Sequence, residues 1–417
     1  MATYTSTVNG GTGVTYTYTY DQNGNITKIV YSTGEEIRYE YDDLGQLTRE
    51  DNGLLNKTYV YTYDNAGNII SKKTYALTAA GTTPSSPTST YSYGYSSGTW
   101  GDMLTSYRGT TITYDAIGNP LSYYNGSSYT FAWNGRQLKS ATKGGVTYTF
   151  KYNDEGIRTS KTKNGVTTTY YLNGSQIIGE ETNGNITVYL YDVSGLPVGL
   201  QYHGATYSAT TWDVYWFEKN LHGDIIAVYN STGTKIVSYT YDAWGNCTAT
   251  STTNTVVANN PFRYRGYYYD ADLGLYYLNS RYYDANVGRF VNADSIGYLG
   301  ANGDLNSYNL YAYCSNNPVM GYDPMGTWDW GSLKKFGQNC LKAAVVVIGV
   351  AIAVGSIGAA IGGTIASGGA GAVAIPAAVA VATKALAISS VAVAVIGSAS
   401  IAVAEQGNAV SYLVGEN

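Results

Sequence analysis

The chain has 417 residues, of which 45 are tyrosine and 50 are glycine, while only 13% are charged. Its net charge of −5 gives no positive surface for a nucleic-acid backbone, so we expect no nucleic-acid partner. The three cysteines are too few for a disulfide framework and the two histidines, His203 and His222, stand in different repeats, so the sequence predicts neither a metal site nor a cofactor.

The chain starts MATYTSTVNG, which lacks the basic start and apolar run of a secretory signal. The tyrosine-rich pattern follows almost at once, without the capping element that repeat arrays need. We therefore expect that Met1 is not the natural start and that the chain is an N-terminally truncated fragment of a longer protein.

A short motif recurs up to about residue 290: tyrosine, aspartate or asparagine, two variable residues, then glycine. We call it the YD motif. Its copies lie at residues 20–25, 41–47, 63–68, 114–119, 191–195, 229–233 and 241–246, with degenerate copies at 133–136 and 152–156.

The residues around each YD motif predict a β-hairpin. Alternation with period two, as in residues 16–20, predicts a strand with one aromatic face. The aspartate opens a turn by bonding the backbone ahead of it, and the glycine supplies the positive φ angle. Residues 1–260 are therefore expected to form an all-β array of tandem antiparallel hairpins in one long sheet.

One insert, residues 78–99, interrupts the array and is rich in Pro, Ser, Thr and Gly without any charge. This composition predicts a surface loop, in which the strand-like TYSYGY stretch can rejoin the sheet. The many tyrosines allow two interpretations: rings that pack between hairpins, or an aromatic platform for sugars. Their recurrence with the fold period favours packing.

Residues 261–326 carry an ordered string of motifs. The string contains PFRYRGYYYD, GLYYL, RYYD, GRF, NLYAY, NNP and DPMG. It resembles the Rhs repeat-associated core, which ends the YD-repeat shell in Rhs toxins, in the C subunits of insecticidal toxin complexes and in wall-associated bacterial proteins; teneurins are similar. The resemblance covers roughly residues 14–326. It implies a spiral β-sheet closed into a hollow shell that holds a variable C-terminal toxin, with residues 261–326 plugging one end.

In some members of this family the core is an aspartyl autoprotease that separates shell and toxin. The family motif is a pair of DPxG sequences, with cleavage shortly after the second. Here the second is intact at Asp323-Pro324-Met325-Gly326, whereas the first reads Asp294-Ser295-Ile296-Gly297 without its proline and stands farther away than usual. Asp294 and Asp323 are therefore the candidate catalytic pair. The alternative is that both carboxylates only cap turns.

Residues 327–417 differ sharply in composition. No residue from 343 to 383 is charged, Lys384 interrupts the run, and residues 385–404 again carry no charge. Both stretches exceed the roughly 18 residues that indicate a membrane span. We expect a helical hairpin that either contacts a membrane through residues 343–404 or packs inside the shell.

Three functions compete. The leading hypothesis is a secreted or cell-surface polymorphic toxin, with a neighbouring cell as target and an immunity protein as partner, whose β-shell presents a membrane-active or pre-toxin segment. The second is a wall-associated adhesin that binds cell-surface glycans. The third is an aspartyl autoprotease that uses Asp294 and Asp323 to release the C-terminal segment, which begins shortly after Gly326.

Overall fold

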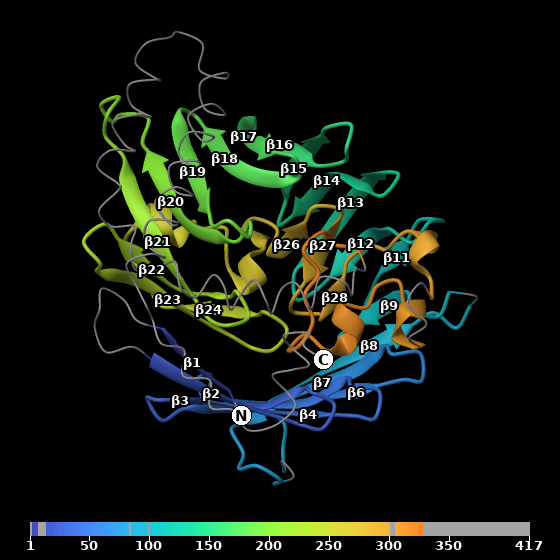
Figure 1. Ribbon diagram of the computed structural model, residues 1–417. Coiled ribbons are helices and arrows are strands. Elements are labelled where there is room, and N and C mark those ends of the chain that lie inside the picture. Colours follow the sequence, from blue (N-terminus) through green and yellow to red (C-terminus); the bar gives the residue numbers. More distant parts are fainter. Residues whose placement is uncertain (1, 7–13, 83–84, 99, 301–304, 328–417) are drawn as a thin grey trace, which may run out of the picture.

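The computed structural model describes residues 2–6, 14–82, 85–98, 100–300 and 305–327. These residues form almost exclusively antiparallel strands, in sheets of 10, 14 and 4 strands. The two larger sheets follow one another as a curved ribbon that wraps around the smallest sheet (Figure 1). The all-β fold predicted from the YD motifs is thus confirmed for the described residues. The predicted helical hairpin after Thr327 lies outside them.

The first sheet contains strands in strict chain order, each paired with the next. They are β1 (Ala2–Ser6), β2 (Val14–Tyr20), β3 (Ile26–Tyr31), β4 (Glu36–Tyr41), β5 (Leu47–Asn52), β6 (Lys57–Tyr63), β7 (Ile69–Ala76), β8 (Ser89–Tyr95), β9 (Leu104–Tyr107) and β10 (Thr110–Thr111). β8 is the TYSYGY stretch, so the insert rejoins the sheet as expected.

The second sheet continues the same pattern. Its strands are β11 (Thr113–Tyr114), β12 (Pro120–Tyr124), β13 (Ser128–Asn134), β14 (Gln137–Lys143), β15 (Val146–Tyr152), β16 (Arg158–Lys163), β17 (Val166–Asn173), β18 (Gln176–Thr182), β19 (Asn185–Tyr191), β20 (Pro197–His203), β21 (Asp213–Lys219), β22 (Ile225–Asn230), β23 (Lys235–Tyr241) and β24 (Cys247–Ala249).

The expectation of one long sheet was wrong, because the ribbon breaks at Ile112. The N–H group of Ile112 still bonds the carbonyl of Thr105 in β9, at 2.8 Å, and its side chain is buried. The next residue, Thr113, already pairs with Ser122 in β12, and the register shifts immediately afterwards. A bulge of this kind bends a strand, so the ribbon changes direction here instead of running on.

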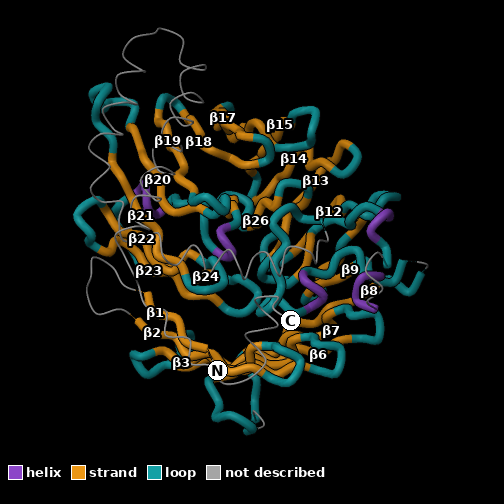
Figure 2. The backbone as a smooth tube through the Cα atoms, in the orientation of Figure 1, coloured by secondary structure: helices purple, strands orange, loops and turns teal. Residues whose placement is uncertain are grey.

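Residues 261–326 form the third unit, which we call the plug. Its sheet contains β25 (Tyr268–Asp270), β26 (Leu275–Leu278), β27 (Arg281–Asp284) and β28 (Arg289–Phe290). The few helical segments are α1 (Thr255–Ala258), before the plug, and within it η1 (Tyr264–Gly266), η2 (Ile296–Tyr298), η3 (Leu305–Tyr308) and η4 (Cys314–Asn316); Figure 2 shows how short they are. Within the described part of the chain, no helix is long and apolar enough to cross a membrane.

The YD turns have one recurring geometry, seen at Asp64. One carboxylate oxygen accepts the N–H groups of Ala66 and Asn68, both at 2.9 Å, and the other accepts the side-chain amide of Asn68, at 2.9 Å. The same pattern occurs at Asp21, Asp42, Asp115 and Asp242. Each turn therefore fixes an Asn or Gln side chain four residues after the aspartate.

In five YD motifs of the described chain the tyrosine joins one hairpin to the preceding one. The hydroxyl of Tyr63 donates to the Leu47 carbonyl at 2.6 Å, and that of Tyr241 donates to the Ile225 carbonyl at 2.6 Å. Tyrosines on the other positions of the strands, such as Tyr18 and Tyr107, are buried in the core. The rings thus pack between hairpins and the hydroxyls reach backbone, as the packing interpretation expects.

Two motif glycines form a matched pair for testing the contact between ribbon and plug. Gly24 and Gly118 have φ angles of +84° and +82°, so any side chain is strained at both. A Cβ atom at Gly24 would meet nothing within 4 Å, whereas one at Gly118 would lie 2.6 Å from the Tyr311 hydroxyl of the plug.

We expect Gly24→Ala to lower the free energy of unfolding by about 1 kcal/mol through backbone strain alone. Gly118→Ala should lower it by about 2–4 kcal/mol, because the plug must also shift. Urea denaturation of the two variants measures the difference. Equal losses would mean that the plug does not rest on this turn.

Candidate functional site

The plug is docked on the edge of the ribbon that carries the YD turns. Three plug asparagines donate their side-chain amides to the residues that the turns present, Asn317 to Asn25 (3.0 Å), Asn316 to Gln46 (2.8 Å) and Asn309 to Asn68 (2.8 Å). Farther along the ribbon, Asn246 in the last YD turn donates to the Ala285 carbonyl of the plug, at 2.8 Å. The YD turns are therefore both hairpin connections and the seat of the plug.

Buried charges strengthen this docking. Arg158 in β16 pairs with Asp270 of the plug at 2.9 Å, and both side chains are fully buried. The guanidinium also lies over the rings of Tyr170 and Tyr277, at 4.7 and 4.4 Å. The carboxylate of Asp284, also in the plug, accepts the hydroxyl of Tyr123 in β12 at 3.0 Å.

The ribbon closes on itself at a contact between its two sheets, which we call the seam. Glu50 in β5 accepts the N–H of Ala243, in the last YD turn, at 2.9 Å. Lys72 in β7 donates to Asp242 in the same turn, at 3.2 Å. Burial, together with the nearby carboxylate of Asp242, raises the pKa of Glu50 to about 8. Burial of Glu50 beside a second carboxylate at the seam therefore favours its protonated form.

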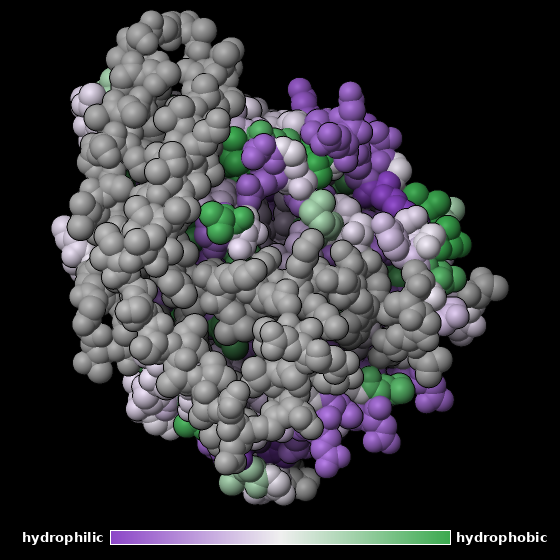
Figure 3. Space-filling model, in the orientation of Figure 1, coloured by the Kyte–Doolittle hydropathy of each residue, from purple (hydrophilic) through white to green (hydrophobic). Residues whose placement is uncertain are grey.

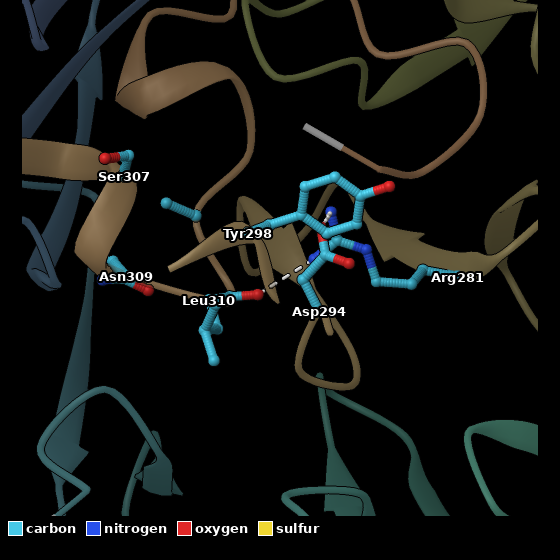
Figure 4. A pocket seen from close by; sticks show the side chains of 7 residues that line it. Arg281, Asp294, Tyr298, Ser307, Asn309 and Leu310 are labelled. Carbon is cyan, nitrogen blue, oxygen red and sulfur yellow. Dashed lines mark hydrogen bonds and ion pairs between the residues drawn. The ribbon is translucent and has the colours of Figure 1, made fainter. Parts of the chain in front are cut away.

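Asp294 and Asp323 are brought together by one arginine, Arg281 at the start of β27. One terminal guanidinium nitrogen lies 2.9 Å from an Asp294 oxygen and 3.6 Å from an Asp323 oxygen. The other terminal nitrogen donates to the Leu310 carbonyl at 2.9 Å (Figure 4). All three charged side chains are almost completely buried. The two aspartates named from the sequence thus lie on either side of one arginine, and their catalytic role stays a prediction.

The two carboxylates differ in their surroundings. Burial, and the neighbouring charge of Asp294, raise the pKa of Asp323 to about 7, although Arg281 opposes the rise. Asp294 has the shorter contact with Arg281, and it also accepts the N–H of Ser295 at 2.7 Å. An opposite charge and hydrogen bonds favour the ionised form. Asp323 can therefore hold a proton near neutral pH, beside Asp294 on the same guanidinium group.

The chain leaves the plug along this pair. The Gly326 carbonyl accepts the Nε–H of Arg281, and the N–H of Thr327 donates to Asp323 at 3.1 Å. Gly326 has a φ angle of +68°, and a Cβ atom there would lie 2.5 Å from the Leu278 carbonyl. Only glycine fits this position, so the residues after Asp323 are held in one path. The glycine of the DPMG motif thereby sets where the chain passes the carboxylates.

A small opening lies beside Asp294 and Arg281. It is lined by Arg281, Asp294, Tyr298, Ser307, Asn309, Leu310 and Ala312 (Figure 4). Its free space is about 10 Å³, the lower limit of what a single ordered water molecule needs. Acid–base peptide hydrolysis requires two carboxyl groups, a peptide carbonyl that accepts a hydrogen bond from an N–H group, and room for one water molecule. This part of the plug contains these components.

Sequence reasoning missed several residues of this site. Arg281 is part of the RYYD string but carries no separate signal. The hydroxyl of Tyr267 accepts the N–H of Asp323 at 2.8 Å and lies in a tyrosine-rich run where no single tyrosine stands out. The side-chain amides of the YD turns, on which the plug rests, could have been found from the sequence. An Asn or Gln follows the YD aspartate by four residues in five turns of the described chain.

A curved ribbon of YD hairpins, closed at a seam around an internal plug, defines a plugged β-shell. The sequence model of the Teneurin YD-shell family matches residues 3–319. The chain therefore belongs to the Teneurin YD-shell family.

The relatives include a nuclease and a toxin protein. The tRNA nuclease WapA of Bacillus subtilis strain 168 is 37% identical over 248 residues, which is 55% of this chain and 10% of WapA. The toxin protein Tse5 of Pseudomonas aeruginosa is 41% identical over 66 residues, which is 16% of this chain and 5% of Tse5. The chain thus spans only a small part of the length of these relatives.

Solved structures share the fold. The crystal structure of TcdB2-TccC3-Cdc42 superimposes with a TM-score of 0.57 at 19% sequence identity, over 79% of this chain and 17% of the other chain. The structure of the Photorhabdus luminescens Tc holotoxin pore gives a TM-score of 0.55 at 20% identity, over 75% of this chain and 17% of the other. At these identities the likeness describes the fold alone.

Proposed function

We propose that this chain is the closing part of a toxin-carrying YD-shell, whose plug holds and then releases the segment that follows Thr327. The observation that carries the proposal is the anchored exit: Arg281 contacts Asp294, Asp323 and the Gly326 carbonyl together. The toxin relatives support a carrier role for the shell. In this proposal residues 1–260 form the wall, residues 261–326 the plug and residues 327–417 the cargo.

Release proceeds by self-cleavage at the chain exit. Charged Asp294 takes a proton from a water molecule, whose oxygen attacks the peptide carbonyl carbon at or a few residues after Gly326. Protonated Asp323 donates its proton as the C–N bond breaks, so that an amine and a carboxylic acid result. Where the Gly326 carbonyl is the one attacked, the Nε–H of Arg281 stabilises its developing negative charge.

Asp294→Asn and Asp323→Asn should each abolish the release of a small C-terminal fragment from the purified chain, because either change removes one member of a two-carboxylate unit. Gel electrophoresis after long incubation measures the fragment. Asp43→Asn, at an exposed turn position, is the control and should cleave like the unchanged chain. A fragment that still forms in both site variants would reject the aspartate mechanism.

Ser295→Pro should accelerate cleavage. Ser295 has a φ angle of −61°, which proline adopts without strain. The substitution deletes the N–H that bonds Asp294 at 2.7 Å, and a carboxylate with fewer donors is a stronger base. It also restores the family's DPxG sequence. The rate of fragment formation should rise about tenfold, the effect of one hydrogen bond of about 1.4 kcal/mol. A slower rate in a folded variant would show that this N–H assists the reaction.

The cargo is proposed to be membrane-active, since residues 343–383 and 385–404 are uncharged and rich in Ala, Gly and Val. Leakage from dye-loaded anionic vesicles tests this, with the uncleaved Asp323→Asn chain as comparison. The toxin relatives support an extracellular or cell-surface location, a neighbouring cell as target and an immunity protein as partner. Glycan binding remains an alternative prediction, in which the tyrosine-rich sheet contacts sugars.

A further inference from the structure

Four apolar side chains of the plug are exposed within one short stretch, between Asp294 and Asn309. Ile296 is 74% exposed, Tyr308 58%, Leu299 43% and Tyr298 38%. Scattered exposed apolar side chains are normal on proteins, but a group of them marks an interaction site. Other exposed apolar side chains of the described chain stand on separate turns and strands, such as Leu54 and Val166. Outside its grey atoms, the face seen in Figure 3 carries both hydrophilic and hydrophobic residues. We call the four residues the apolar face.

Local bonding holds the apolar face in shape. Ser295 begins η2, and its carbonyl accepts the N–H of Tyr298 at 3.0 Å. Gly300, with a φ angle of +68°, bonds the Ser307 carbonyl at 3.1 Å and lies directly against the Tyr308 ring. Tyr308 is thereby held against Gly300, the residue that follows Leu299.

The apolar face borders the aspartate pair. Tyr298 lines the same small opening as Arg281 and Asp294, and its ring lies beside both side chains (Figure 4). Arg281 in turn holds the Gly326 carbonyl. The apolar face and the exit of the chain therefore meet at one arginine.

The next residues of the chain have the chemistry that such a face binds. After Thr327 the sequence reads Trp328-Asp329-Trp330. At 3.8 Å between successive Cα atoms, Trp330 stands at most about 11 Å along the chain from anchored Thr327. Indole rings bury large apolar areas and are frequent anchors in recognition. Two of them therefore follow the anchored Thr327 within three residues of the sequence.

We propose that the apolar face of Ile296, Tyr298, Leu299 and Tyr308 is the docking site for the Trp328–Trp330 segment of the same chain. Gly326 and Thr327 are already fixed on one side of the aspartate pair. Docking of the tryptophans fixes the chain on the other side, so the peptide to be cut is held at both ends against the carboxylates. This consequence for cleavage rests on the proposed function, whereas the docking itself does not require cleavage.

Photocrosslinking in the full chain tests the docking. Tyr308 is replaced by p-benzoylphenylalanine, in the Asp323→Asn background that keeps the segment attached, and crosslinked peptides are mapped by mass spectrometry. We expect the main crosslink to join position 308 to a peptide that contains residues 328–330 of the same chain. The matched control places the same probe at Val166, an exposed residue at the start of β17, and should not label that peptide. Crosslinks from position 308 mainly to other segments or to a second chain, or a yield no higher than at position 166, would overturn the proposal.

The second arm measures cleavage. Ile296→Ser together with Leu299→Ser should slow fragment formation at least tenfold, Ile296→Val with Leu299→Val should restore most of the rate, and Val166→Ser should have no effect. A chain that crosslinks as expected but never cleaves would reject the proposed release while leaving the docking supported. A chain that cleaves at the same rate with the face removed and shows no crosslink would reject the docking alone.

Discussion

Arg158→Met is expected to lower the free energy of unfolding by about 3 kcal/mol, because it removes the fully buried partner of Asp270 and leaves this buried carboxylate with Lys161 alone. Arg158 and Asp270 are both fully buried, at 2.9 Å from one another. Methionine fills part of the space between the Tyr170 and Tyr277 rings, so loss of charge pairing dominates over loss of volume.

The matched control is Lys163→Met. Lys163 pairs with Asp272 of the plug, but its side chain is 45% exposed. Exposed pairs of this kind contribute less than about 1 kcal/mol. Chemical denaturation of both variants provides the comparison. Equal, small losses would show that Arg158 is not a principal anchor of the plug.

The second large effect is a loss of stability as the pH rises. Burial raises the pKa of Glu50 to about 8, of Asp323 to about 7 and of Asp284 to about 6. In the unfolded chain these groups titrate near pH 4. Between the unfolded and the folded pKa the folded state binds more protons, so the free energy of unfolding falls from about pH 4 to about pH 8.

Two other plug residues set the acid limit. Asp270 and Asp272 both form ion pairs with lysines, and Asp270 also pairs with Arg158. These pairs lower the pKa of both carboxyl groups despite their burial. Their contribution is present above about pH 4 and is lost in stronger acid. We therefore expect maximal stability in mildly acidic solution, and a melting temperature that is higher near pH 5.5 than near pH 8.5.

Glu50→Gln separates the seam from the other groups. An uncharged amide cannot ionise, so this variant should lose less stability than the unchanged chain between about pH 6 and pH 8.5. Glu155→Gln, at an exposed turn, should retain the full slope. Melting temperatures across this range measure both. A stability that rises steadily with pH in the unchanged chain would contradict a protonated seam.

The sequence could predict the repeats because each hairpin is specified locally. The aspartate, the glycine and the alternating tyrosines act within a few residues, as the bonds at Asp64 and Gly67 show. The seam could not be predicted, since Glu50 and Ala243 meet only after the ribbon has curved through both sheets. The break at Ile112 also escaped, because it depends on a change of pairing partner.

The site shows the same division. Asp294 and Asp323 were found through their motif, but nothing in the sequence placed Arg281 between them. A lone buried arginine has no periodicity, and its role arises from contacts that span the plug. The contacts of the Asn309, Asn316 and Asn317 amides could not be predicted either, because their partners lie in turns more than 200 residues earlier in the chain.

The position of the cut tests the central claim most directly. N-terminal sequencing and intact-mass measurement of the small fragment from the unchanged chain locate the hydrolysed bond. The anchored exit predicts a new N-terminus at Thr327 or within a few residues after it, where Arg281 and Asp323 hold the backbone. A cut in the 78–99 insert or within residues 343–404, or a chain that stays intact throughout the incubation, would contradict release at the aspartate pair.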